Sequence, residues 1–366
     1  MRRDYDAGLV RVIREKQVIE DHDGWQVVVK KVPDDDREHV LDPRVLAIAE
    51  KKKQRLSVLK RGYSLMNERW RPDKISYDLS TTEIEVEETL IPIHGDHMID
   101  IFIYTPEGVK ENRPVIIFFH GGGYTAGDMK LYINQMKLIC ELSDAVVVFP
   151  EYRLAPENPY PAQMIDGQGT IRWVVDHAQE LHIDPSRLMI CGDSAGGSLV
   201  NSCLITDTDH LITKAFEIYP GVDSTSLDYL ELYSFSYDKY PVIEEQKELA
   251  YSRIDKIKNA SHGTEQDSLV LQGRTSVKNP EVSIVYASDE QLKALPPIAI
   301  AYSEYDYLRV SNEYFAERLS RLGHDVKTIR YNGCDHGFLD CLGLVPQAEE
   351  LCHVIAEEVH AMNRNA

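Results

Sequence analysis

The feature that most constrains the fold is an alternation of short, continuous apolar runs with helix-like stretches. The runs of strand length are PVIIFF at 114–119, AVVVF at 145–149, RLMIC at 187–191, FEIYP at 216–220 and PIAIAY at 297–302. Residues with helical spacing lie near 130–142, 160–180, 195–206, 311–322 and 346–362. Strands that are apolar on both sides need cover on both sides, so the pattern predicts an α/β fold with a mostly parallel sheet between helices. Such sheets place their chemistry at the carboxyl ends of the strands.

One of these strands leads into the motif Gly192-Asp193-Ser194-Ala195-Gly196, and a helix-like stretch follows it. This is the G-x-S-x-G pattern in the strand–turn–helix setting that presents a serine on a sharp turn. The two glycines suit the turn because strand and helix must pass closely there. A phosphate-binding glycine turn is the alternative interpretation. We predict that Ser194 is a nucleophile whose hydroxyl lies above the sheet.

A second motif, FFHGGGY at 118–124, follows the strand at 114–119. Consecutive glycines free backbone N–H groups to face a ligand, which the stabilisation of a developing oxyanion requires. We assign Gly122 and Gly123 as donors, together with Ala195, the residue after the serine. His120 is expected to orient this loop and not to act as a base.

A nucleophilic serine needs a base, and the base needs an acid that orients it; in this arrangement the chain order is serine, acid, histidine. His336 lies in a loop that follows an extended run, at the sheet edge where Ser194 is expected, and it is the predicted base. Glu304 and Asp306 follow the strand PIAIAY and are the two candidate acids. Asp335 adjoins His336, but neighbours along a loop rarely meet in the required geometry.

Six motifs together resemble the bacterial hormone-sensitive-lipase-like esterases, a group within the α/β-hydrolase fold. They are HGGG at 120–123, YRLAPE at 152–157, PYPA at 159–162, GDSAGG at 192–197, YDYLR at 305–309 and HGF at 336–338. The similarity covers roughly 82–226 and 279–342. It implies an α/β-hydrolase fold with a mostly parallel central sheet, helices on both faces and a cap.

The resemblance also implies a role for each site residue. Ser194 corresponds to the nucleophile, His336 to the base and Asp306 to the acid, while Gly122 and Gly123 correspond to the oxyanion hole. The acid motif of the family usually reads Asp-Pro-Leu-x-Asp. Residues 306–310 read Asp-Tyr-Leu-Arg-Val, without the proline and the second carboxylate. We therefore expect the support of this loop to differ from the family pattern.

The cap that the resemblance implies is built from N-terminal helices plus an insert. We divide the chain into an N-terminal cap or extension at 1–81, a hydrolase core at 82–226 and 291–366, and a cap insert at 227–290. Helices are expected at 43–66 and 243–258, and a strand hairpin at 82–92 and 98–105. Aromatic residues of the insert either pack the cap on the body or form an exposed apolar lid; they are Tyr229, Tyr233, Phe235, Tyr237 and Tyr240.

The charge balance argues against nucleic-acid binding, because 40 basic and 60 acidic residues give a net charge of −20 that repels phosphate backbones. Residues 1–74 are net basic and are expected either to lie against the acidic body or to form a solvated arm. No apolar run approaches the roughly 18 residues of a membrane span, and the start lacks the apolar run of a signal peptide. We expect no membrane partner and a cytoplasmic location. The six cysteines show no metal-ligand spacing and are expected to be reduced core residues.

These features predict a serine carboxylesterase that hydrolyses soluble short-acyl esters through an acyl-enzyme intermediate. Its expected partner is a small-molecule ester, and neither a cofactor nor a metal is expected. An amidase or formamidase of the same fold is an alternative, because the same triad serves either acyl group. A non-catalytic ligand-binding member of the fold is the alternative from another class. A possible homodimer is expected only because similar enzymes dimerise.

Overall fold

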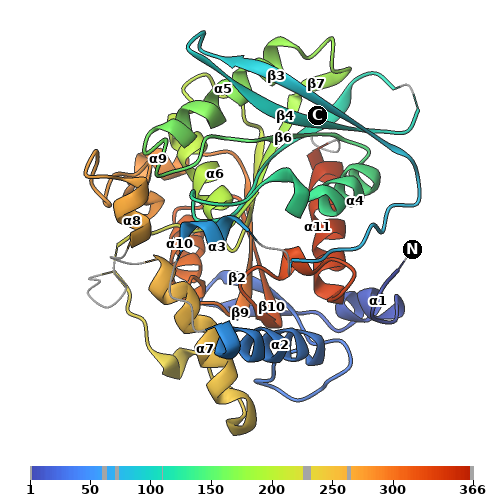
Figure 1. Ribbon diagram of the computed structural model, residues 1–366, viewed down its shortest axis with the longest axis vertical. Coiled ribbons are helices and arrows are strands. Elements are labelled where there is room, and N and C mark those ends of the chain that lie inside the picture. Colours follow the sequence, from blue (N-terminus) through green and yellow to red (C-terminus); the bar gives the residue numbers. More distant parts are fainter. Residues whose placement is uncertain are drawn as a thin grey trace.

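The computed structural model describes residues 2–59, 64–70, 74–108, 110–225, 232–261 and 265–362. In this part of the chain one sheet runs through the whole molecule, with its strands in the order β1-β2-β10-β9-β8-β7-β5-β6-β4-β3 (Figure 1). The strands are β1 (Val18–His22), β2 (Trp25–Lys30), β3 (Ile84–Ile93), β4 (His97–Pro106), β5 (Arg113–Phe119), β6 (Val146–Pro150), β7 (Ile183–Asp193), β8 (Lys214–Ile218), β9 (Ile298–Tyr305) and β10 (Val326–Asp335).

The strands from β2 to β6 in this order all pair in parallel. The hairpin expected at 82–92 and 98–105 forms β3 and β4, which continue the sheet in antiparallel pairing beyond β6. Strands β5, β6 and β9 are buried along their whole length, as their continuous apolar sequences require. The predicted mostly parallel α/β sheet is confirmed.

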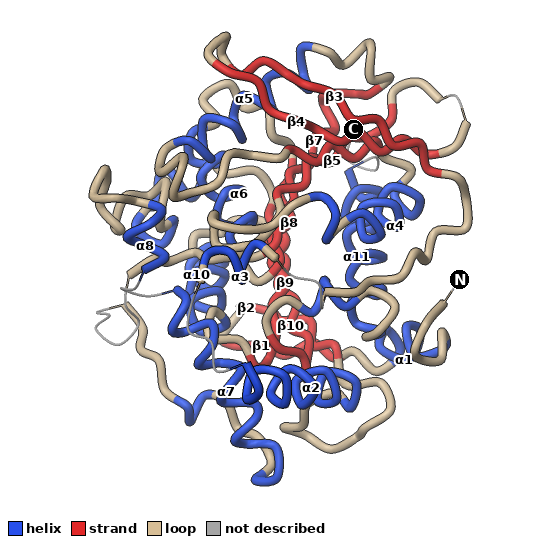
Figure 2. The backbone as a smooth tube through the Cα atoms, viewed as in Figure 1, coloured by secondary structure: helices blue, strands red, loops and turns tan. Residues whose placement is uncertain are grey.

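Helices cover both faces of the sheet (Figure 2). Helices α4 (Ile133–Ser143) and α11 (Pro346–Met362) pack on one face, and α5 (Ala162–Asp176), α6 (Ala195–Thr206) and α10 (Arg309–Arg321) pack on the other. Each face has its own apolar cluster because successive strand residues point to opposite sides. The remaining helices are α1 (Gly8–Glu15), α2 (Pro43–Leu59), α3 (Leu65–Arg69), α7 (Glu244–Ser261), α8 (Glu265–Val270) and α9 (Asp289–Lys293).

An N-terminal hairpin, which the sequence analysis did not anticipate, extends the sheet. Strands β1 and β2 meet at a tight turn in which Asp23 and Gly24 both have positive φ angles, of 56° and 93°. An Asp-Gly pair between alternating apolar residues favours this hairpin turn. Strand β2 pairs in parallel with β10. Residues 18–30 thus belong to the sheet, although the predicted division assigned 1–81 to a cap or extension; the other proposed boundaries stay predictions.

The net-basic N-terminal segment lies against acidic residues of the C-terminal helix. Arg3 forms a bidentate ion pair with Glu349, in which Nε lies 2.7 Å from Oε2 and Nη2 lies 2.6 Å from Oε1. Lys30 donates a hydrogen bond to the buried Glu350 at 2.8 Å. The N-terminal segment was expected either to lie against the acidic body or to form a solvated arm. In the structure these residues contact acidic side chains of the body.

The cap insert packs closely on the sheet body. Helix α7 lies beside α2 (Figure 1), and the expected helix at 43–66 is two helices, α2 and α3, on either side of undescribed residues. Tyr240 is completely buried, and the Phe235 ring lies 5.0 Å from that of Tyr307. These contacts favour the packing role that was expected for the aromatic residues, whereas Tyr229 lies outside the described residues.

A carboxyl group is buried in the centre of the sheet, on β8. Glu217 has no exposed surface, and its Oε2 accepts a hydrogen bond from Asn201 Nδ2 at 3.2 Å. Burial raises the pKa of Glu217 from 4.5 to about 8. The folded protein therefore favours the neutral carboxyl group at neutral pH.

We predict that Glu217→Gln raises the melting temperature, and that its advantage grows from about pH 5 to about pH 8. In this window the unfolded wild-type chain releases a proton that the folded chain keeps, so wild-type stability falls as the pH rises; the variant has no such proton. A gap that widens by roughly 2–4 °C in calorimetry is expected.

The exposed strand residue Glu85 supplies the control, because Glu85→Gln should shift the melting temperature by the same amount at pH 5 and at pH 8. A constant difference between Glu217→Gln and wild type across the window would contradict the buried neutral carboxyl group.

Candidate active site

Ser194 lies at a strained turn between β7 and α6. Its backbone has φ 54° and ψ −118°, a conformation that an ordinary side-chain-bearing residue rarely adopts. The glycines on either side permit the turn: a Cβ atom on Gly196 would lie 2.0 Å from the carbonyl oxygen of Phe119, and one on Gly192 would lie 2.5 Å from backbone atoms of Gly196. Strand β7 and helix α6 therefore pass so closely that positions 192 and 196 have no room for a side chain.

Three side chains from three strand ends form a hydrogen-bonded chain. His336, which follows β10, has its Nε2 atom 2.9 Å from Ser194 Oγ and its Nδ1 atom 2.7 Å from Asp306 Oδ2. Asp306, which follows β9, is completely buried, and its Oδ1 accepts a hydrogen bond from the backbone N–H of Leu308 at 3.0 Å. The structure thus brings together the three residues that the sequence predicted as serine, base and acid.

The other carboxylates considered near the site have different partners. Glu304 accepts a hydrogen bond from the backbone N–H of Gly333 at 2.8 Å, and burial raises its pKa. Asp335 forms an ion pair with Arg253 at 2.5 Å. Of the two candidate acids, Asp306 is the one that contacts His336.

The glycine loop is held against the serine turn by a buried carboxylate. Gly121 donates its N–H to Asp193 Oδ1 at 2.7 Å, and the Tyr132 hydroxyl donates to Asp193 Oδ2 at 3.1 Å. Burial, together with the negative charge of Asp340, raises the pKa of Asp193. Because Asp193 immediately precedes Ser194, this carboxylate fixes the distance between the loop and the serine.

The predicted oxyanion donors differ in their positions. Gly123 and Ala195 line the same cavity as Ser194. Gly122 is not among the described lining residues; it has φ 131°, and its carbonyl accepts hydrogen bonds from the N–H groups of Thr125 and Ala126. A Cβ atom on Gly122 would lie 2.0 Å from the Ala126 carbonyl oxygen, so the turn needs glycine there.

His120 is buried within the base of this loop. Its ring stacks on that of Tyr152 at 4.2 Å, and its Nδ1 lies 2.8 Å from the carbonyl oxygen of Gly121. The Tyr152 hydroxyl in turn donates to the His120 carbonyl oxygen at 2.5 Å. These contacts fit the expected role in orienting the loop.

Sequence reasoning missed how strongly the cap insert supports the site. Arg253 of α7 pairs with Asp335, the neighbour of His336, and the two side chains are only 11% and 13% exposed. Burial alone would raise the pKa of Asp335, but the positive charges of Arg253 and Lys52 hold it below its usual range. No signal in the sequence connects Arg253 with this loop, because 82 residues separate it from its partner.

The loop after Asp306 also rests on the insert. Where the family pattern has a second carboxylate, Val310 belongs to an apolar cluster with Tyr240, Ile254 and Tyr307. The Tyr240 hydroxyl donates to the Tyr307 carbonyl oxygen at 3.3 Å. In this chain the loop after Asp306 is therefore supported at position 310 by apolar packing.

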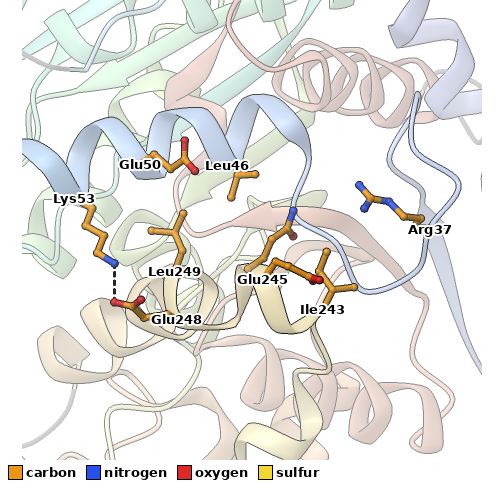
Figure 3. A pocket seen from close by; sticks show the side chains of 9 residues that line it. Arg37, Leu46, Glu50, Lys53, Ile243, Glu245, Glu248 and Leu249 are labelled. Carbon is orange, nitrogen blue, oxygen red and sulfur yellow. Dashed lines mark hydrogen bonds and ion pairs between the residues drawn. The ribbon is translucent and has the colours of Figure 1, made fainter.

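Two cavities are open to solvent near the cap. The one beside Ser194 has a volume of about 90 Å³. A larger hollow of about 820 Å³ lies between α2 and α7, where Leu46 and Leu249 face each other and Lys53 pairs with Glu248 at 2.6 Å (Figure 3). None of its described lining residues is Ser194, His336 or Asp306. The smaller cavity, which Ser194 lines, is therefore the candidate substrate site.

Two features are absent from the residues that the structure describes. Nowhere in these ranges do three His, Cys, Asp or Glu side chains gather closely enough to hold a metal ion. Among the helices that the structure describes, none has the length and apolar character that crossing a bilayer requires.

Comparisons with known proteins agree with this geometry. A family model described as alpha/beta hydrolase fold matches residues 116–340. The chain is 30% identical over 273 residues to the carboxylesterase NlhH of Mycobacterium tuberculosis, covering 73% of this chain and 80% of that protein. It is also 30% identical over 246 residues to an arylesterase of Saccharolobus solfataricus, covering 67% of this chain and 74% of that protein.

Among solved structures, a hyperthermophilic esterase from the archaeon Pyrobaculum calidifontis superimposes with a TM-score of 0.73 at 25% identity. The match covers 88% of this chain and 99% of that one.

We predict that Arg253→Met strongly destabilises the protein, because it leaves the Asp335 carboxylate buried without its cation. Breaking one side of a buried ion pair costs about 3–5 kcal/mol of unfolding free energy, which urea denaturation would measure. Replacing both partners, as Arg253→Met with Asp335→Asn, should recover most of the loss.

Lys53→Met is the matched control, since the ion pair of Lys53 with Glu248 also involves α7, but both of its side chains are exposed. This variant should leave the urea midpoint almost unchanged. Equal effects of the two substitutions would show that the Arg253–Asp335 pair does not hold the loop.

Proposed function

The chain belongs to the α/β-hydrolase fold family, and we propose that it is a carboxylesterase that cleaves short-acyl carboxylic esters through an acyl-enzyme. The observation that carries this proposal is the hydrogen-bonded chain from Ser194 through His336 to Asp306. The relatives named carboxylesterase and arylesterase support an ester as the substrate class.

In the first step, Ser194 Oγ attacks the carbonyl carbon of the ester while His336 Nε2, 2.9 Å away, accepts its proton. Asp306 holds the histidine through Nδ1, which leaves Nε2 as the free acceptor, and its negative charge stabilises the imidazolium that forms. The backbone N–H of Leu308 keeps the Asp306 carboxylate in place.

The backbone N–H groups of Gly122, Gly123 and Ala195 are the proposed donors to the tetrahedral oxyanion. One such donor typically contributes about 3–4 kcal/mol in the transition state. When the intermediate collapses, the bond to the alcohol oxygen breaks and His336 donates its proton to the leaving alkoxide. Water then repeats the cycle on the acyl-enzyme and releases the acid and free Ser194.

The size of the cavity supports a short acyl group. Its volume of about 90 Å³ is smaller than the roughly 150 Å³ of an apolar cavity that accepts benzene. Five apolar side chains surround most of this space, so an unbranched chain of a few carbons fits it; they are Met164, Val270, Leu271, Val282 and Leu308.

We also propose that the enzyme works in the cytosol. All six cysteine thiols are unpaired and five are buried, which suits a reducing compartment. Recovery of the activity only outside the cytosolic fraction would contradict this location.

We predict that kcat/KM on p-nitrophenyl esters, measured from acetate to palmitate, is highest for acetate or butyrate. It should fall by at least about tenfold for decanoate, since longer chains overfill the cavity. The matched p-nitroanilides should be poorer substrates than the esters; a preference for the anilides would identify an amidase instead.

Ser194→Ala controls for background hydrolysis in this series. Its circular dichroism spectrum should match that of the wild type, and its ester turnover should fall to the level of buffer. A folded Ser194→Ala protein that keeps near-normal turnover would refute the assignment of the nucleophile.

A further inference from the structure

The cavity beside Ser194 is lined by both apolar and polar residues. The polar lining residues other than Ser194 include Tyr124, Ser198, Asp223 and Ser224. Asp223 is the only acidic or basic side chain among the described lining residues, and it is 4% exposed. A buried charge at a substrate cavity is costly unless it has a purpose or good partners.

Among the described residues, the hydrogen-bond partners of Asp223 are neutral. Its Oδ1 accepts hydrogen bonds from the backbone N–H and the hydroxyl of Thr225, both at 2.7 Å, and its Oδ2 accepts one from the Tyr233 hydroxyl at 2.5 Å. Burial, strengthened by the negative charge of Asp223, raises the pKa of Tyr233, so this phenol stays a donor.

These contacts leave the carboxylate with unused capacity. A carboxylate has about four acceptor positions, and three are occupied. Within the described residues, no Lys, Arg or His side chain forms an ion pair with Asp223. Because Asp223 lines the cavity, a substrate group that enters comes close to this carboxylate.

We propose that the acyl-binding part of this site selects short acyl groups that carry a hydrogen-bond donor, either a hydroxyl or an ammonium group, and rejects acyl groups that carry a carboxylate. This inference rests on the proposed esterase function and names its substrate class. A donor on the acyl chain fills the free position on Asp223, whereas an anion is repelled at short range in a site of low polarity.

Asp223 also has a local structural role, because its bonds to Thr225 close a turn of the chain. The bonds to Thr225 require only an acceptor at the Oδ1 position, which asparagine also has, and at the Oδ2 position the amide can donate to the Tyr233 hydroxyl instead. The selectivity requires the charge. Asp223→Asn therefore separates the two roles.

The test compares p-nitrophenyl esters of butyrate, 3-hydroxybutyrate, 3-aminobutyrate and hemisuccinate, which share the leaving group and the length of the acyl chain. For the wild type, kcat/KM on the hydroxy and amino esters should exceed that on butyrate by at least about fivefold. The hemisuccinate should be at least about tenfold poorer than butyrate.

In Asp223→Asn, the ratio of amino ester to butyrate should fall by about tenfold, and the hemisuccinate should approach butyrate. Asp238→Asn removes an equal charge from an exposed position of the insert at 227–290, and should leave all ratios as in the wild type. The wild-type ratios alone test the inference if Asp223→Asn does not fold.

Wild-type turnover of butyrate without a preference among the four esters, or ratios that Asp223→Asn leaves unchanged, would overturn this inference but not the esterase function. The absence of turnover on all four esters would overturn both. A preference for the hemisuccinate would contradict the repulsion on which the inference depends.

Discussion

The hydrogen bond between Ser194 and His336 joins residues that are 142 positions apart in the chain, and only the parallel sheet brings them together. Strands β7, β9 and β10 all end at one edge of the sheet. The residues that follow them directly are Ser194, Asp306 and His336. Parallel pairing therefore brings three local sequence signals together in one site. The strained backbone at Ser194 persists because the well-packed strands and helices around it fix its conformation.

Contacts from outside the sheet hold this edge in place. The Arg253–Asp335 pair fixes the loop that carries His336, and the apolar cluster around Val310 fixes the loop that carries Asp306. The N-terminal segment reaches the same cap helix, since Gln246 accepts a hydrogen bond from the N–H of Leu41 at 2.7 Å. The insert thus supports the reacting groups, and its residues Val270, Leu271 and Val282 also line the small cavity beside Ser194.

Features that depend on a short stretch of sequence, such as a sharp turn or a buried strand, could be predicted from the sequence. The glycines around Ser194 and the continuous apolar strands leave few alternatives, so the sheet and the serine turn could be predicted from the residues themselves. The residues left Glu304 and Asp306 as candidate acids, and the family resemblance favoured Asp306, which is the one that contacts His336. The hairpin of β1 and β2 had a local signal in Asp23-Gly24, but its pairing with β10 joins segments about 300 residues apart. No periodicity reports such a contact, nor the pairing of Arg253 with Asp335, because each depends on how distant segments pack.

The central claim is that His336 and Asp306 make Ser194 a nucleophile, and covalent labelling tests it most directly. A p-nitrophenyl alkylphosphonate should add once, displacing p-nitrophenolate, and peptide mass spectrometry should place the adduct on Ser194. The labelling rate should fall by several orders of magnitude in His336→Ala. An adduct on another residue, or an unchanged rate in His336→Ala, would contradict the account.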